Sequence, residues 1–122
     1  MIALLVALAG GVGAVARFLL DGAIRSRIAL LVPAGTFVIN VSGSLLLGFI
    51  TGIVMVGAEP TDFRVVLGTG FLGGYTTFST ATIETVRLLQ QRRWVAAGVN
   101  GVGMLLLGLG AAVLGVFLGT LF

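Results

Sequence analysis

Long apolar stretches alternate with short polar links along the whole chain. Charge-free runs cover residues 1–16, 28–58, 65–83 and 94–122, which are 16, 31, 19 and 29 residues long. A helix that crosses a membrane needs about 20 mostly apolar residues. The last three runs each hold one such helix, and the first reaches this length if Phe18, Leu19 and Leu20 continue the helix past Arg17. The pattern therefore predicts one all-α membrane domain over residues 1–122, with four transmembrane helices at about 2–20, 33–56, 65–89 and 95–121.

The composition agrees with a chain that lies in a membrane. Of its residues 58% are hydrophobic and 9% are charged, whereas a typical soluble domain is about 25% charged. The chain has no cysteine and no histidine. It therefore lacks disulfides, zinc–thiolate sites and the commonest general base. No nucleophile–base pair is visible, so we do not expect an enzyme.

The arginines are distributed unevenly over the links. Six of the seven fall in the links 17–32 and 84–93, and one falls in the link that shares a face with both termini. Excess arginine marks the cytoplasmic side of a membrane protein. The net charge of +3 is therefore explained by the orientation of the chain in the membrane. We expect no nucleic-acid partner, because no basic patch is interleaved with stacking aromatic residues. The six arginines are Arg17, Arg25, Arg27, Arg87, Arg92 and Arg93.

Two of the expected helices carry a polar stripe. On a regular helix the polar and small residues of each stripe lie within an arc of about 80–100°. Polar groups are costly against lipid, so the stripes should face protein or water. Helix–helix adhesion is the simpler explanation for most of them, whereas the donors around Asn40 and residues 73–80 favour a functional site. The stripes are Thr36, Asn40, Gly43, Ser44 and Thr51, and Thr69, Gly73, Thr76, Thr80, Glu84 and Arg87.

The paired glycines Gly73 and Gly74 predict a break in the third helix. A break removes the usual donors from backbone carbonyls, and inside a membrane these carbonyls need another partner. A cation such as Na⁺ can take that place, as in transporters with discontinuous helices. Hydroxyl groups, an asparagine amide and the positive edge of a phenylalanine ring can in turn bind a small anion without a full charge.

Other small residues suit close helix packing. Gly11-x-Gly13-x-x-Ala16 resembles a dinucleotide-binding fingerprint, but the acid expected about 20 residues later is absent. Packing explains these residues better, as it does Gly115-x-x-x-Gly119 in the fourth helix. Asn100 is the one strongly polar residue near the small-residue face of that helix. A structural role is favoured for it, and a place along a transport path is the alternative.

Three motifs together resemble the Fluc (CrcB) family of fluoride channels. The resemblance covers all four expected helices in the family's order. It implies a channel of the cell membrane that lets toxic cytoplasmic fluoride leave passively down its gradient. It also implies an antiparallel dual-topology dimer with a structural Na⁺ at its centre. The motifs are Gly13-Ala14-x-x-Arg17, Pro33-x-Gly35-Thr36-x-x-x-Asn40-x-x-Gly43 and Gly70-Phe71-x-Gly73-Gly74-x-Thr76-Thr77-Phe78-Ser79-Thr80.

The resemblance also implies roles for individual residues. The carbonyls of Gly73 and Thr76 would hold the Na⁺. Asn40 and the ring edge of Phe78 would contact fluoride, and Arg17 would concentrate anions in the vestibule. Glu84 stands where the family has an acid after the motif, and its role is open. The hydroxyls of Ser79 and Thr80 would continue the fluoride pathway.

Two departures bear on the assembly. The family usually has a second phenylalanine where this chain has Ala81, so part of the aromatic contribution to the pore is missing. The arginine bias is also strong for a chain that inserts equally in both orientations. The dimer partner is therefore either a second copy or an oppositely oriented paralogue. The main alternative function is a small multidrug-resistance-type cation exporter, which needs a carboxylate in the first helix; residues 1–20 contain none.

Overall fold

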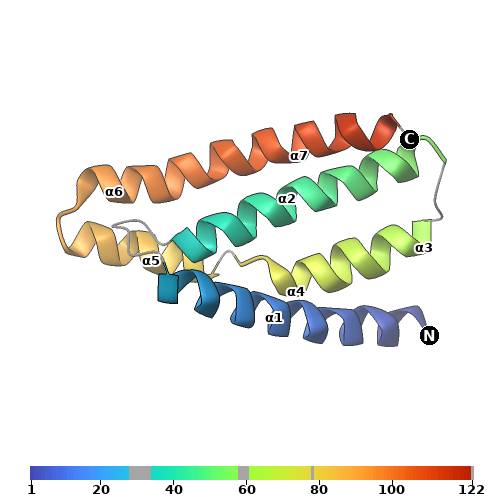
Figure 1. The fold of residues 1–122 in the computed structure, drawn as a ribbon, viewed down its shortest axis with the longest axis horizontal. Coiled ribbons are helices and arrows are strands. Elements are labelled where there is room, and N and C mark those ends of the chain that lie inside the picture. Colours follow the sequence, from blue (N-terminus) through green and yellow to red (C-terminus); the bar gives the residue numbers. More distant parts are fainter. Residues whose placement is uncertain (28–33, 58–60, 78, 122) are drawn as a thin grey trace.

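The computed structural model describes residues 1–27, 34–57, 61–77 and 79–121, whose regular structure is helical throughout. The helices run lengthwise, and both chain termini lie at one end (Figure 1). In chain order the elements are α1 (Ile2–Arg27), α2 (Ala34–Met55), α3 (Thr61–Arg64), η1 (Val65–Leu72), α4 (Gly73–Tyr75), α5 (Ser79–Gln90), α6 (Trp94–Gly98), η2 (Val99–Gly103) and α7 (Met104–Thr120). The segments η1 and η2 are π-helical.

Three helices among the described residues are long and apolar enough to cross a membrane. They are Ile2–Arg27, Gly35–Met55 and the continuous run Trp94–Thr120, and their most apolar windows have mean hydropathies of 2.0 to 2.3. Their outer faces expose large apolar side chains such as Phe18, Val95 and Leu105. Helices satisfy their backbone polar groups internally, which lipid requires. The chain is therefore a multi-pass membrane protein.

The helices α2 and α7 pack closely through facing glycines. A Cβ atom on Gly115 would collide with the Leu45 carbonyl oxygen, and one on Gly119 with the Phe49 carbonyl oxygen. On α2, a Cβ on Gly48 would meet the Ala112 carbonyl oxygen. Small residues allow two membrane helices to approach until their backbones touch. The packing interpretation of Gly115-x-x-x-Gly119 is thus confirmed.

The helix α1 packs on η1 and α4 in the same manner. A Cβ on Gly13 would overlap the Phe71 carbonyl oxygen, and one on Gly74 would overlap the Gly10 carbonyl oxygen. A Cβ on Gly11 would meet nothing within 4 Å outside its own helix backbone. The expectation of close packing therefore holds for Gly13 and is wrong for Gly11.

The third helical stretch breaks later than the paired glycines predicted. Gly73 is helical, with φ −61° and ψ −39°. The helix ends at Tyr75, and Thr76 is extended, with φ −82° and ψ 161°. Because α1 lies against Gly74, the absence of a side chain there serves helix contact. The break near Gly73–Gly74 is therefore corrected to one that begins at Thr76.

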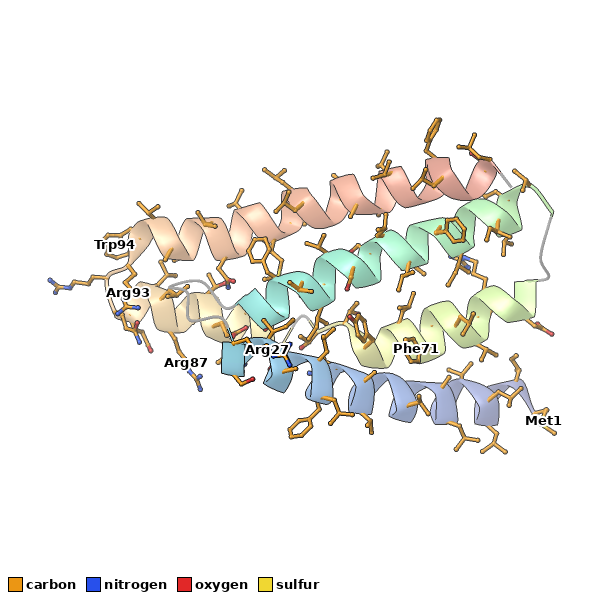
Figure 2. The ribbon with its side chains drawn as sticks, viewed as in Figure 1. Met1, Arg27, Phe71, Arg87, Arg93 and Trp94 are labelled. Carbon is orange, nitrogen blue, oxygen red and sulfur yellow. The ribbon has the colours of Figure 1, made fainter. Side chains whose placement is uncertain are left out.

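The arginine-rich links lie together, away from the termini. Figure 2 shows Arg93 and Trp94 at one end of the molecule, Arg87 near them, Arg27 further in where α1 ends, and Met1 at the other end. A small apolar cluster of Leu88, Ala96 and Ala97 joins α5 to α6 near this end. The predicted separation of the arginine-rich links from the termini is thus present in the fold.

Candidate functional site

A groove with a volume of about 570 Å³ lies beside the break. It is lined from α2, η1, α4, α5, η2 and α7, and its described lining residues include no charged side chain. The wall is largely apolar, with glycines and aliphatic side chains between the polar groups. The groove thus offers neutral hydrogen-bonding groups in apolar surroundings. The polar lining residues are Asn40, Ser44, Thr76, Thr77, Thr82, Thr85 and Asn100.

Asn40 on α2 holds the backbone at the break. Its Nδ2 donates to the Thr77 carbonyl oxygen at 2.8 Å, and its Oδ1 accepts from the Thr77 N–H at 2.9 Å. Nδ2 also approaches the Met104 sulfur at 3.2 Å. A thioether is a weak acceptor, so the N–H that points to Met104 is the more easily redirected donor. Asn40 therefore makes two hydrogen bonds that hold the Thr77 backbone, and it keeps one further N–H donor on the groove side.

The same contact changes the surroundings of the Gly73 carbonyl. In an unbroken α-helix the Thr77 N–H would donate to this carbonyl, since helical bonds join residues four apart. Here that N–H is directed to Asn40 instead. The Thr76 N–H still bonds the Leu72 carbonyl at 2.9 Å, and the Thr76 hydroxyl bonds the same carbonyl at 2.8 Å. The helical ladder thus stops one residue before Thr77.

Asn100 on η2 forms a second polar group in the groove wall. Its Nδ2 donates to the Thr85 hydroxyl at 2.7 Å and to the Ala81 carbonyl oxygen at 3.3 Å. The residue is only 1% exposed, and its Oδ1 has no hydrogen-bond partner among the described residues. The amide therefore ties η2 to α5, as the structural interpretation predicts, and it also lines the groove.

Two of the predicted site residues lie away from the groove. Glu84 is buried, and its Oε2 accepts from Arg25 Nη2 at 3.1 Å. Arg25 Nε also donates to Asp21 at 2.9 Å, so the guanidinium joins α1 to α5. Arg17 is half-buried on α1, and its Nε has no hydrogen-bond partner in the described part of the chain. The structure does not bring Arg17 or Glu84 together with Asn40.

The structure describes some of the remaining predicted site residues and not others. Phe78 lies outside the described residues, and Ser79 and Thr80 begin α5. Gly73 and Thr76 both line the groove with Asn40. The single arc expected for the third helix is wrong, because Thr69 is exposed while Glu84 pairs with α1. The π-helical turns of η1 and the break both change the rotation of successive residues, which a regular 100° step ignores.

Some contributing residues are not evident from the sequence alone. Thr77 acts through its backbone, Met104 lies one turn after Asn100, and Arg25 pairs with a carboxylate 59 residues away. Of these three residues only Thr77 could be suspected from the sequence, because it lies inside the dense polar motif. Among the described residues no three acidic, histidine or cysteine side chains gather as metal ligands.

Comparison with known proteins gives one consistent result. Residues 4–116 match the family described as "CrcB-like protein, Camphor Resistance (CrcB)". The chain is 55% identical to "Fluoride-specific ion channel FluC 1" of Leifsonia xyli over 99% of this chain and 88% of the relative. It is 50% identical to "Fluoride-specific ion channel FluC 2" of Cutibacterium acnes over 98% of both chains. It is also 46% identical to "Fluoride-specific ion channel FluC 2" of Mycobacterium bovis over 90% of this chain and 84% of that protein.

The relatives are named as channels, which form a non-enzymatic class. The family match spans residues 4–116, a range that contains the helix break and the residues that line the groove. The chain therefore belongs to the CrcB-like family.

Proposed function

We propose that this protein is a fluoride-selective channel of the cell membrane, which exports toxic cytoplasmic fluoride passively down its gradient. Its relatives are named fluoride-specific ion channels. The observation that carries the proposal is the groove beside the helix break, whose described lining has neutral donors and no charged side chain. Fluoride itself is the permeating ligand in this proposal.

Neutral donors suit the passage of a small, strongly hydrated anion. A pore must replace the water around fluoride with donors, yet it must also release the ion. Several weak neutral sites allow both entry and exit, whereas a buried arginine would hold the anion too tightly. The only arginine of α5, Arg87, is exposed, and Arg25 is tied to Asp21 and Glu84. The charges of the described chain are thus kept out of the groove.

Individual residues take the following roles in the proposal. Asn40 offers fluoride the N–H that approaches the Met104 sulfur. Phe78 contributes its ring edge, and the hydroxyls of Ser79 and Thr80 continue the pathway. Arg17 raises the anion concentration at the entrance. Glu84 lies outside the groove, beside the pathway, and its negative charge is balanced by Arg25.

A structural Na⁺ at the break fits the backbone geometry. The ligands in this proposal are the carbonyl oxygens of Gly73 and Thr76. The Thr77 N–H is directed to Asn40, so the Gly73 carbonyl loses its usual helical donor. Thr76 is extended, which turns its carbonyl away from the helix direction. Carbonyl oxygens at such a break are suitable ligands for Na⁺, which neutralises their dipoles and keeps the break in shape without being transported.

Removal of Na⁺ is expected to lower the thermal stability of the purified protein. A cation that binds the folded state and not the unfolded state stabilises it in proportion to the logarithm of its concentration, by about 2.7 kcal/mol at a hundredfold excess over Kd. The melting temperature in detergent should rise with Na⁺ and stay flat with equal K⁺. Equal curves for the two cations would contradict the Na⁺ site.

The proposal places this site in an antiparallel dimer. Three long helices and the broken stretch formed by η1, α4 and α5 would together make four membrane spans. The two subunits would insert in opposite orientations, with the Na⁺ at the dimer centre. Ala81 lines the groove where the family's second pore phenylalanine is expected. This departure and the arginine bias favour an oppositely oriented paralogue as the partner, while a homodimer is the second possibility.

Fluoride efflux from proteoliposomes is the direct test of the proposed function. Vesicles that contain the purified chain should release fluoride and retain chloride when a K⁺ ionophore balances the charge. The expected preference is large, because the neutral donors of the groove replace the water around the smaller, more strongly hydrated anion. Equal release of both anions would contradict the proposal. Proton-coupled movement of an organic cation would instead indicate the multidrug-type exporter. Co-reconstitution with an oppositely biased paralogue tests whether a partner is required.

A further inference from the structure

The arginine-rich end of the molecule has a large excess of unpaired positive charge. This end comprises Arg27, Arg87, Arg92 and Arg93, which are all exposed. Two of the four acids, Asp21 and Glu84, fall near this end, and both are bound to Arg25. The other two acids fall in the link 57–64. The four arginines therefore have no acidic partner among the described residues.

The turn between α5 and α6 holds two of these arginines outward. The N–H groups of Gln91, Arg92 and Arg93 bond back to carbonyls at the end of α5 at 2.9–3.0 Å. Arg92 has φ 57°, the left-handed backbone region that glycine usually occupies after a helix. An arginine at this position keeps a charged side chain on a tight, hydrogen-bonded turn, where a glycine would fit with less strain.

This turn lies at the depth of a membrane surface. Trp94 follows it directly and is 65% exposed, and the long apolar run Trp94–Thr120 begins at the same residue. Tryptophan is enriched at membrane–water interfaces, where headgroups lie. Figure 2 shows Trp94 beside Arg93 and near Arg87, with Arg27 further in where α1 ends. Arg87, Arg92 and Arg93 are thus placed at headgroup level, beside apolar helix faces that meet acyl chains.

We propose that the arginine-rich end binds anionic phospholipid headgroups. The guanidinium group donates two parallel hydrogen bonds to a phosphate, which lysine does not match, and all basic residues of this chain are arginine. A soluble acidic protein would not account for Trp94 and the apolar surface next to it. The inference does not rest on the proposed transport function, since it uses only residues outside the groove.

The single tryptophan makes the proposal directly measurable. Trp94 is the only tryptophan of the chain, so its fluorescence reports the lipids at this end alone. The full chain is reconstituted in phosphatidylcholine vesicles with equal mole fractions of acyl-brominated phosphatidylglycerol or acyl-brominated phosphatidylcholine. Bromine quenches tryptophan at short range. We expect the anionic lipid to be preferred on the order of fivefold or more, and the preference to decline as salt is added.

Matched variants separate this site from a general effect of charge. The triple variant R87Q/R92Q/R93Q should lose most of the preference, whereas Arg64→Gln at the other end should retain it. Equal quenching by both lipids in the native protein would overturn the proposal, as would a preference that the triple variant keeps. If the triple variant does not assemble, the salt titration of the native protein decides: a preference unchanged at high salt also overturns it.

Discussion

Replacing Asn40 with aspartate is expected to reduce fluoride flux by about tenfold or more. The carboxylate can still accept the Thr77 N–H, but it cannot donate to the Thr77 carbonyl as Nδ2 does. It also places a negative charge in the wall of the proposed anion path. Two like charges 4 Å apart repel by about 4 kcal/mol at an effective dielectric constant of 20, well above the 1.4 kcal/mol of a tenfold change. The measurement is the initial rate of fluoride release from proteoliposomes.

Ser42→Ala is the matched control on the same helix. Ser42 bonds the Tyr75 hydroxyl at 3.0 Å, so it also joins α2 to α4, but it is not among the described residues that line the groove. Its loss should leave the flux near the native rate. Unchanged flux in Asn40→Asp would remove Asn40 from the proposed pathway. Equal loss in both variants would show that the effect comes from helix packing.

Gly115→Val is expected to prevent stable packing of α2 against α7. Its Cβ would overlap the Leu45 carbonyl oxygen and lie 2.8 Å from the Phe49 nitrogen, so backbone atoms have to move. Overpacking of this kind typically costs about 1–3 kcal/mol, and more where backbone blocks relief. The variant should have a lower melting temperature in detergent and elute as aggregate in size-exclusion chromatography.

Gly110→Val supplies the control for helix propensity and added volume. Gly110 lies on the same helix, and a Cβ there meets nothing within 4 Å. The two variants exchange the same residues in one helix, so intrinsic propensity cancels between them. We expect Gly110→Val to behave like the native chain. Comparable destabilisation of both would mean that the α2–α7 contact does not depend on the missing side chain.

The features readable from the sequence are those that a repeating pattern determines. Charge-free runs mark the long apolar helices, and the links rich in arginine lie together at one end (Figure 2). Gly13 and Gly115 lie at helix contacts, as small residues in membrane helices should. Each of these inferences follows from the helical repeat of about 3.6 residues and from the free-energy cost of placing polar groups in lipid.

The features that the pattern missed depend on contacts between distant segments. The break begins at Thr76 because Asn40 of α2 holds the Thr77 backbone, and glycine content says nothing of that bond. Glu84 turns to Arg25 because α1 extends to Arg27, beyond the expected limit of residue 20. Three residues of the polar motif, Gly73, Thr76 and Thr77, do line the groove. The spacing of residues along the sequence does not show which side chain or backbone group each of these residues contacts.

The pairing of helices determines when the chain can complete its fold during synthesis. The main partner of α2 is α7, and that of α1 is the η1–α4 stretch. Ribosomes deliver the chain from its N-terminus, so α2 enters the bilayer well before α7 has been made. During that interval its glycine face, with Gly48 and Gly52, lacks the α7 backbone that it meets in the fold. Because α7 is made after α2, its arrival completes this contact, and a chain that stops before Gly115 leaves Gly52 without the backbone of Val116 and Gly119 that it meets in the fold.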